Sequence, residues 1–139
     1  MDNQQGITVS IELQNMDMAS MLFSLEPFLE SATGKFGYAV ARNVRKLREA
    51  CTEFLQIRQN LIQELGEKKL DEEGRFTGTI AIDTESDKFL EYGKRLGEVS
   101  DISHTVEIYK IPYELLPDSI TAKDMLTLEW MLIEDNGEL

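Results

Sequence analysis

The chain has 139 residues, of which 42% are hydrophobic and 29% are charged, and its formal net charge is −12. That length predicts a single domain spanning residues 1–139, and the composition excludes long disordered segments. The excess of acids argues against direct binding to nucleic acid, which depends on clustered Lys and Arg.

The sequence carries no signal for a membrane or for secretion. No apolar run reaches the ~20 residues that a bilayer-spanning helix needs. The polar start, residues 1–5, lacks the basic flank and apolar core of a signal peptide. Cys51 is the only cysteine, which excludes an internal disulfide and fits a reducing compartment. We therefore expect a cytoplasmic protein that binds no membrane.

The first predicted elements are a strand and a short helix. Residues 7–13 alternate between apolar and polar side chains, which indicates a strand. Asn15 or Asp17 is suited to cap a helix that continues to Leu29. Because Pro27 lies inside that helix, we expect either a kink there or a helix that begins late.

A long apolar stripe follows over residues 36–65. Its hydrophobic positions recur at spacings of three and four, which predicts one continuous helix of roughly eight turns. Gly66 is expected to close this helix in the left-handed conformation. Such a rod is either the spine on which the chain packs or a surface that pairs with another chain. Cys51 lies on the stripe, so we expect a buried apolar residue rather than a nucleophile.

The second half alternates between short strands and helices. Residues 67–75 read as a charged loop that closes in a turn, and strands are predicted at 76–82 and 105–111. Cap residues at 83–86 introduce a helix, and the pair Thr121 and Asp124 introduces the last one. The elements together predict a mainly helical α+β fold, with one long central helix and shorter helices packed on a small three-stranded sheet.

No catalytic or metal-binding constellation accompanies these elements. His104 is the only histidine, and the single cysteine gives it no zinc-binding set. The acids at 71–74 lack the alternating ligands of an EF-hand loop, and no phosphate-binding glycine motif is present. We therefore expect no enzymatic activity, no cofactor and no metal.

Charge is distributed unevenly along the chain. Five cations and no acid lie between residues 35 and 48, whereas from Leu96 onward ten acids face only Lys110 and Lys123. Either the two regions pack near each other within the fold, or the acidic region is a surface for a basic partner. The partner-binding residues would then be Asp118, Asp124, Glu129, Trp130, Glu134 and Asp135. The sequence also predicts an anion site near a helix start, formed by Lys35, Arg42 and Arg45.

Five stretches carry a family resemblance. They are residues 38–47 (YAVARNVRKL), 58–62 (RQNLI), 65–74 with LGEK and DEEG, 106–112 (VEIYKIP) and 120–131 (ITAKDMLTLEWM). In that order they resemble a group of small, mostly uncharacterised proteins from phages and prophages of Gram-positive bacteria. The resemblance covers about residues 22–134. It implies a protein made in the bacterial cytoplasm during infection.

Two functional hypotheses follow from the resemblance and the charge. The first is a non-enzymatic phage accessory protein that binds a protein partner through its acidic surface. Its sharpest form is an anti-defence inhibitor, similar in action to anti-CRISPR proteins, which blocks a basic nucleic-acid-binding nuclease of the host. The alternative is a phage assembly or scaffolding factor, in which the long helix pairs with a second copy to form a homodimer.

Overall fold

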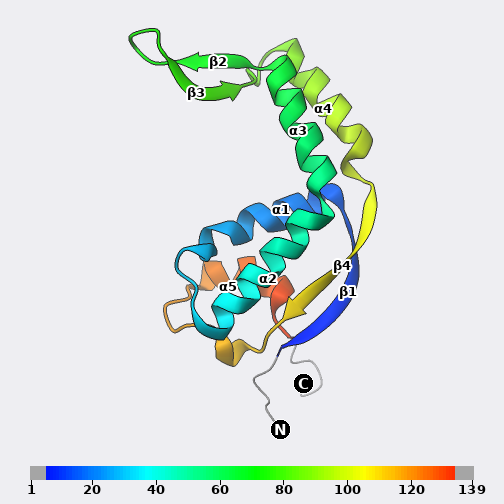
Figure 1. The fold of residues 1–139 in the computed structure, drawn as a ribbon, viewed down its shortest axis with the longest axis vertical. Coiled ribbons are helices and arrows are strands. Elements are labelled where there is room, and N and C mark those ends of the chain that lie inside the picture. Colours follow the sequence, from blue (N-terminus) through cyan, green and yellow to red (C-terminus); the bar gives the residue numbers. More distant parts are fainter. Residues whose placement is uncertain (1–5, 134–139) are drawn as a thin grey trace. The chain divides into compact units, whose positions relative to one another are not determined.

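The computed structural model describes residues 6–133, and these form two compact units (Figure 1). Unit 1 is built from residues 6–50 and 103–133, and unit 2 comprises residues 51–102. Across this described range, no helix has both the length and the apolar character that a membrane span requires.

The sheet of unit 1 is a pair of antiparallel strands, β1 (Ile7–Gln14) and β4 (Ser103–Lys110). Ile7 lies opposite Lys110, and the register continues without a shift to the pairing of Gln14 with Ser103. The alternation predicted from the sequence is present in β4, where Val106 and Ile108 are buried and Thr105 and Glu107 are exposed. One face of this pair therefore contributes to the core of unit 1.

Helices complete unit 1. α1 (Asn15–Leu25) continues into the 3₁₀ turn η1 (Glu26–Leu29), where Pro27 occupies the first turn. α2 (Gly34–Ala50) packs against α1 and β4. Beyond β4 lie η2 (Tyr113–Leu115), α5 (Ala122–Leu128) and η3 (Glu129–Met131). The core residues of this unit include Met18, Leu22, Leu25, Val40, Leu47, Ile108, Leu128 and Met131.

Unit 2 consists of a helix pair and a hairpin. α3 (Thr52–Leu65) packs beside α4 (Asp87–Ser100), while β2 (Glu67–Leu70) and β3 (Phe76–Ala81) form a second antiparallel pair. Arg95 links the helices, with Nη1 2.7 Å from one Glu64 carboxylate oxygen and Nη2 3.1 Å from the other. The buried residues are few: Cys51, Phe54, Leu61, Leu65 and Leu96.

The prediction of one continuous helix over residues 36–65 is wrong. The backbone of Cys51 leaves the helical region, with φ −115° and ψ 25°, and separates α2 from α3. Hydrophobic spacing is insensitive to such a break, because one non-helical residue leaves the i, i+3, i+4 pattern readable on both sides. The homodimer hypothesis loses the long helix on which it depended.

The predicted three-stranded sheet is also wrong. The strand predicted at 76–82 does not join β1 and β4, but pairs with β2, a segment that the sequence presents as a charged loop. The sequence of β2, EKKL, does not alternate between apolar and polar side chains, so no pattern marks it as a strand. In the structure all four residues are exposed. Residues 6–133 therefore contain two separate two-stranded sheets.

Gly66 has a different role from the predicted one. Its φ of −86° and ψ of 171° are extended rather than left-handed. A Cβ at this position would lie 2.5 Å from the carbonyl oxygen of Ile62 and 2.7 Å from Cγ2 of Ile80. Glycine is needed here because α3 and β3 approach each other closely.

Candidate binding sites

The first candidate site lies on unit 1 and is organised by Arg42 of α2. The guanidinium donates hydrogen bonds to the hydroxyl of Tyr38 and to Oγ1 of Thr8, each at 3.3 Å. It also lies over the ring of Tyr109, 4.9 Å from the ring centroid. Two hydroxyl acceptors and one aromatic face fix the direction of this cation without neutralising it.

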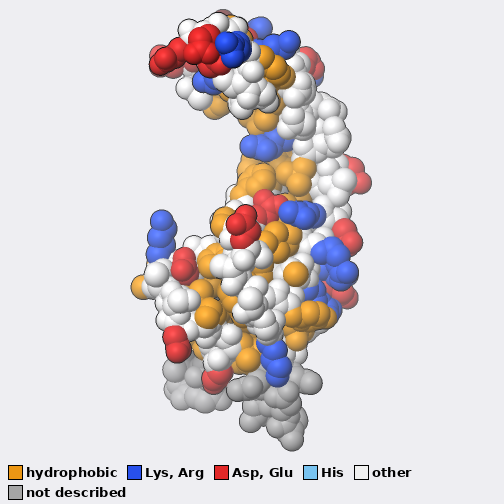
Figure 2. Space-filling view, turned by 60° about the vertical axis from the view of Figure 1, so that its left-hand side comes forward, with side chains coloured by type: hydrophobic (Ala, Val, Ile, Leu, Met, Phe, Trp, Pro, Cys, Tyr) orange, Lys and Arg blue, Asp and Glu red, His pale blue; other side chains and the backbone are white. Residues whose placement is uncertain are grey.

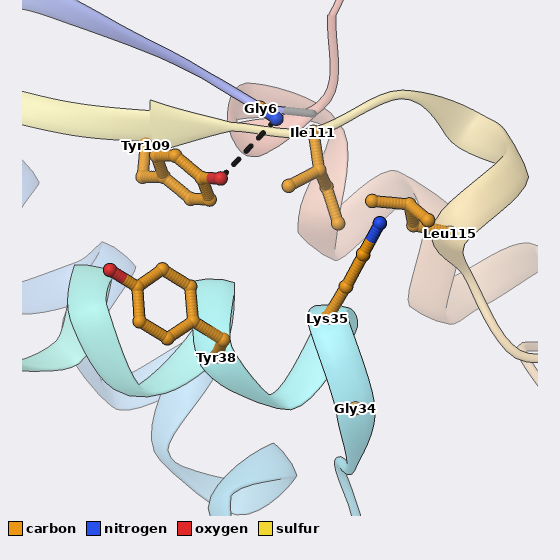
Figure 3. Close-up of a pocket in the computed structure, with 7 residues that line it drawn as sticks. All are labelled: Gly6, Gly34, Lys35, Tyr38, Tyr109, Ile111 and Leu115. Carbon is orange, nitrogen blue, oxygen red and sulfur yellow. Dashed lines mark hydrogen bonds between the residues drawn. The ribbon is translucent and has the colours of Figure 1, made fainter. Parts of the chain in front are cut away.

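Two cavities adjoin the Tyr38 ring. One, of about 410 Å³, is lined by Gly6, Gly34, Lys35, Tyr38, Tyr109, Ile111 and Leu115 (Figure 3). In that view Lys35 extends toward Ile111 and Leu115, and the Tyr109 hydroxyl accepts a hydrogen bond from the Gly6 N–H at 3.3 Å. The other cavity, of about 220 Å³, is lined by Tyr38, Ala41, Arg42 and Arg45. The three residues of the predicted anion site, Lys35, Arg42 and Arg45, therefore border adjoining cavities.

The cations of α2 differ in their partners. Lys46 lies 3.8 Å from a carboxylate oxygen of Glu107, and Arg48 lies 2.7 Å from one of Glu26. By contrast, Arg42 and Arg45 pair with no carboxylate among residues 6–133. Of the two alternatives for the basic region, packing near the acidic carboxy-terminal region is present in unit 1, where α2 packs against β4 and Lys46 lies beside Glu107.

The predicted acidic face is only partly assembled. Asp124 belongs to a capping box: its carboxylate accepts from the Thr121 N–H at 3.3 Å, and its own N–H donates to Thr121 Oγ1 at 3.1 Å. Asp118 and Glu129 are exposed, and Trp130 is half-buried. Glu134 and Asp135 lie outside the described residues. The capping pair predicted from Thr121 and Asp124 is therefore confirmed, and it gives Asp124 a structural role at the start of α5.

The second candidate site is the β2–β3 ribbon of unit 2, which sequence reasoning missed. Leu70 lies directly across from Phe76, and these side chains are 59% and 48% exposed. The Lys68 ammonium lies 5.1 Å from the centre of the Phe76 ring. Figure 2 shows hydrophobic side chains open to view on this unit, with charged side chains of both signs near the ribbon. Because the two residues lie opposite each other on paired strands, their exposed apolar surfaces are next to each other.

Local sequence explains why the ribbon turns where it does. The Asp71 carboxylate accepts hydrogen bonds from the N–H groups of Glu73 and Arg75, both at 2.9 Å. Gly74 adopts a φ of 81°, which glycine adopts readily. Thr77 adds a hydrogen bond across the ribbon, from its hydroxyl to the Lys69 carbonyl at 3.0 Å. The acids predicted as a charged turn therefore lie at the tip of a β-hairpin.

Residues considered for chemistry occupy structural positions. Cys51 is fully buried, and burial raises the pKa of its thiol, which lowers the thiolate fraction that a nucleophile needs. His104 lies in β4 opposite Leu13. Within the described range, no group of three or more His, Cys, Asp and Glu side chains is arranged to hold a metal ion.

Comparisons with protein-family models, with curated proteins and with solved structures gave no match for this chain. The candidate sites therefore rest on the geometry of the chain itself, and the resemblance to phage proteins remains a prediction.

Proposed function

We propose that this protein acts by binding another protein, and that the β2–β3 ribbon of unit 2 is the element that its partner covers. The observation that carries the proposal is the exposed pair of Leu70 and Phe76. A ribbon of two strands is marginally stable in water without a covering layer. Complete burial of a Leu or Phe side chain is worth about 1.5–3 kcal/mol, so a partner gains from covering this pair.

The surroundings of the pair indicate the kind of partner surface that suits it. Lys68, Lys69 and Arg75 lie on the ribbon, and the acids at 71–73 lie at its tip. An apolar centre bordered by charged groups is the usual organisation of a protein–protein interface. The complementary surface is an apolar patch with cations beside it, positioned to meet the acidic tip.

The phage resemblance directs this proposal to a protein of the infected bacterium or of the virion. A host defence nuclease is a suitable example, because such an enzyme carries Lys and Arg where it contacts nucleic acid. The exposed carboxylates of Asp118 and Glu129 on unit 1 are a further contact in this hypothesis.

The test compares what three forms of the full chain retain from a lysate of a Gram-positive bacterium. They are the native chain, the double variant Leu70→Ser with Phe76→Ser, and the control Leu126→Ser. Leu126 is a matched control because it is 71% exposed but belongs to α5 of unit 1. We expect a protein that the native chain and the control retain and that the double variant loses. Circular dichroism melting establishes that all three are folded.

Two results would overturn the proposal. One is retention of the same proteins by the folded double variant, because binding would then not involve Leu70 and Phe76. The other is a native chain that enriches nothing over the tag alone. Raising the salt concentration separates two contributions to partner binding. The contribution of the acidic tip weakens with salt, whereas that of the apolar pair persists.

A further inference from the structure

The α2 face of unit 1 has a geometry that a facing helix requires. Tyr38, Ala41, Arg42 and Arg45 are spaced i, i+3, i+4 and i+7, and they surround the cavity of about 220 Å³. Four residues at that spacing form the hole that receives one side chain of an opposing helix in knobs-into-holes packing. Ala41 keeps the hole open, because its methyl group is the smallest of the four side chains.

The charge of this hole selects an acidic side chain. Arg42 and Arg45 face it, and neither pairs with a carboxylate in the described part of a chain whose net charge is −12. The Arg42 guanidinium is already oriented by Tyr38, Thr8 and Tyr109. When a carboxylate binds there, the Arg42 side chain therefore loses little further conformational entropy. Its guanidinium group can donate two parallel, charge-assisted hydrogen bonds to the carboxylate.

We propose that this face of α2 is a docking surface for an acidic helix of a protein partner, with a Glu or Asp side chain seated between Arg42 and Arg45. Tyr38 is 57% exposed and supplies the apolar contact beside the charge. The cavity lined by Lys35 lies nearer the amino-terminal end of α2. In this proposal it receives a second side chain of the docked helix. A nucleic acid fits less well, because the excess negative charge of the protein repels a polyanion.

The surface is distinct from the β2–β3 ribbon, so this inference does not depend on the proposed function. The ribbon contact depends on an apolar pair in unit 2, whereas this second contact depends on two arginines in unit 1.

The test uses a fluorescent helical peptide with Leu and Glu along one face, and measures its anisotropy against the full chain. A peptide with Gln in place of each Glu controls for charge, and an oligothymidine of equal charge tests for nucleic acid. Arg45→Gln removes one cation of the hole, Ala41→Leu fills the hole and leaves both cations, and Lys94→Gln removes a cation of α4 as the matched control.

We expect saturable binding of the Glu peptide that weakens about tenfold or more in Arg45→Gln and in Ala41→Leu, and that Lys94→Gln leaves within about twofold. The Gln peptide should bind at least about tenfold more weakly than the Glu peptide. Equal binding by Ala41→Leu would contradict the hole geometry. No binding of the Glu peptide to the native chain, or binding of the oligothymidine as tight as that of the peptide, would overturn the proposal.

Discussion

The side chain of Asn43 binds both backbone groups of Tyr109. Its amide nitrogen donates to the Tyr109 carbonyl at 2.9 Å, and its amide oxygen accepts from the Tyr109 N–H at 2.7 Å. Among residues 6–133, β1 is the one strand that forms a ladder with β4, and Asn43 supplies bonds to Tyr109 that a further strand would make. This contact joins α2 to β4 and brings the Tyr109 ring to Arg42.

Replacing Asn43 by Ala should destabilise the protein strongly. The side chain is fully buried, and its loss leaves the Tyr109 N–H and carbonyl without these partners. We expect the free energy of unfolding to fall by about 2–4 kcal/mol, measured by urea denaturation. Asn60→Ala is the control, because Asn60 is exposed and its side chain accepts a hydrogen bond from the neighbouring Gln56 side chain on the helix surface. If the free energy of unfolding falls equally in both variants, the hydrogen bonds between Asn43 and Tyr109 do not stabilise the fold more than a surface contact does.

Removing the α5 cap should lower stability without a change in charge. Thr121→Ala deletes the hydroxyl that accepts from the Asp124 N–H, and such a loss costs about 1 kcal/mol. Thermal unfolding measures the effect, with Ser119→Ala as the control because Ser119 is exposed and lies before the helix. An unchanged melting temperature for Thr121→Ala would mean that α5 is held by packing alone.

The thiol of Cys51 should react slowly in the native protein. Burial raises its pKa above the ordinary value of 9.0, so less thiolate is present at pH 8 than for an exposed cysteine. We expect Ellman's reagent to label it roughly a hundredfold more slowly in native buffer than in denaturant. The contribution of this shift to stability is present below pH 9.0 and is lost as the pH rises through the higher folded value. Equally fast labelling in the two conditions would contradict the burial of Cys51.

The contact between Glu64 and Arg95 should be visible in an acid titration. The hydrogen bond from Arg95 lowers the pKa of the Glu64 carboxyl below its ordinary value of 4.5. Its contribution to stability is complete above pH 4.5 and is lost as the pH falls through the lower folded value. In the variant Arg95→Gln, carboxyl carbon chemical shifts should show the Glu64 pKa returning toward 4.5. If Glu64 titrates identically in the native chain and in Arg95→Gln, the contact between Glu64 and Arg95 does not form in solution.

Local signals predicted most of the individual elements. Alternation identified the strands beginning at Ile7 and near Thr105, and cap residues identified the starts of α4 at Ser86 and of α5 at Thr121. Sequence patterns failed where the outcome depends on distant contacts. Spacing alone does not reveal the break at Cys51, and it does not indicate with which strand β3 pairs.

The candidate sites were predictable to different degrees. Arg42 and Arg45 share a helix face by their spacing, and the sequence identified both of them. Thr8 and Tyr109 join them from β1 and β4, and no local pattern relates these strands to α2. The exposed pair of Leu70 and Phe76 depends on a strand of four exposed residues, EKKL, which has no apolar period to detect.

Hydrogen–deuterium exchange tests the central claim most directly, that a partner protein covers the β2–β3 ribbon. It is measured on the full chain alone and in complex with the protein that the native chain retains. We predict fast exchange of the amides of residues 67–70 and 76–81 in the isolated chain, at least about tenfold slower exchange in the complex, and little change in β1 and β4. Protection confined to other segments, with ribbon amides unchanged, would contradict the account.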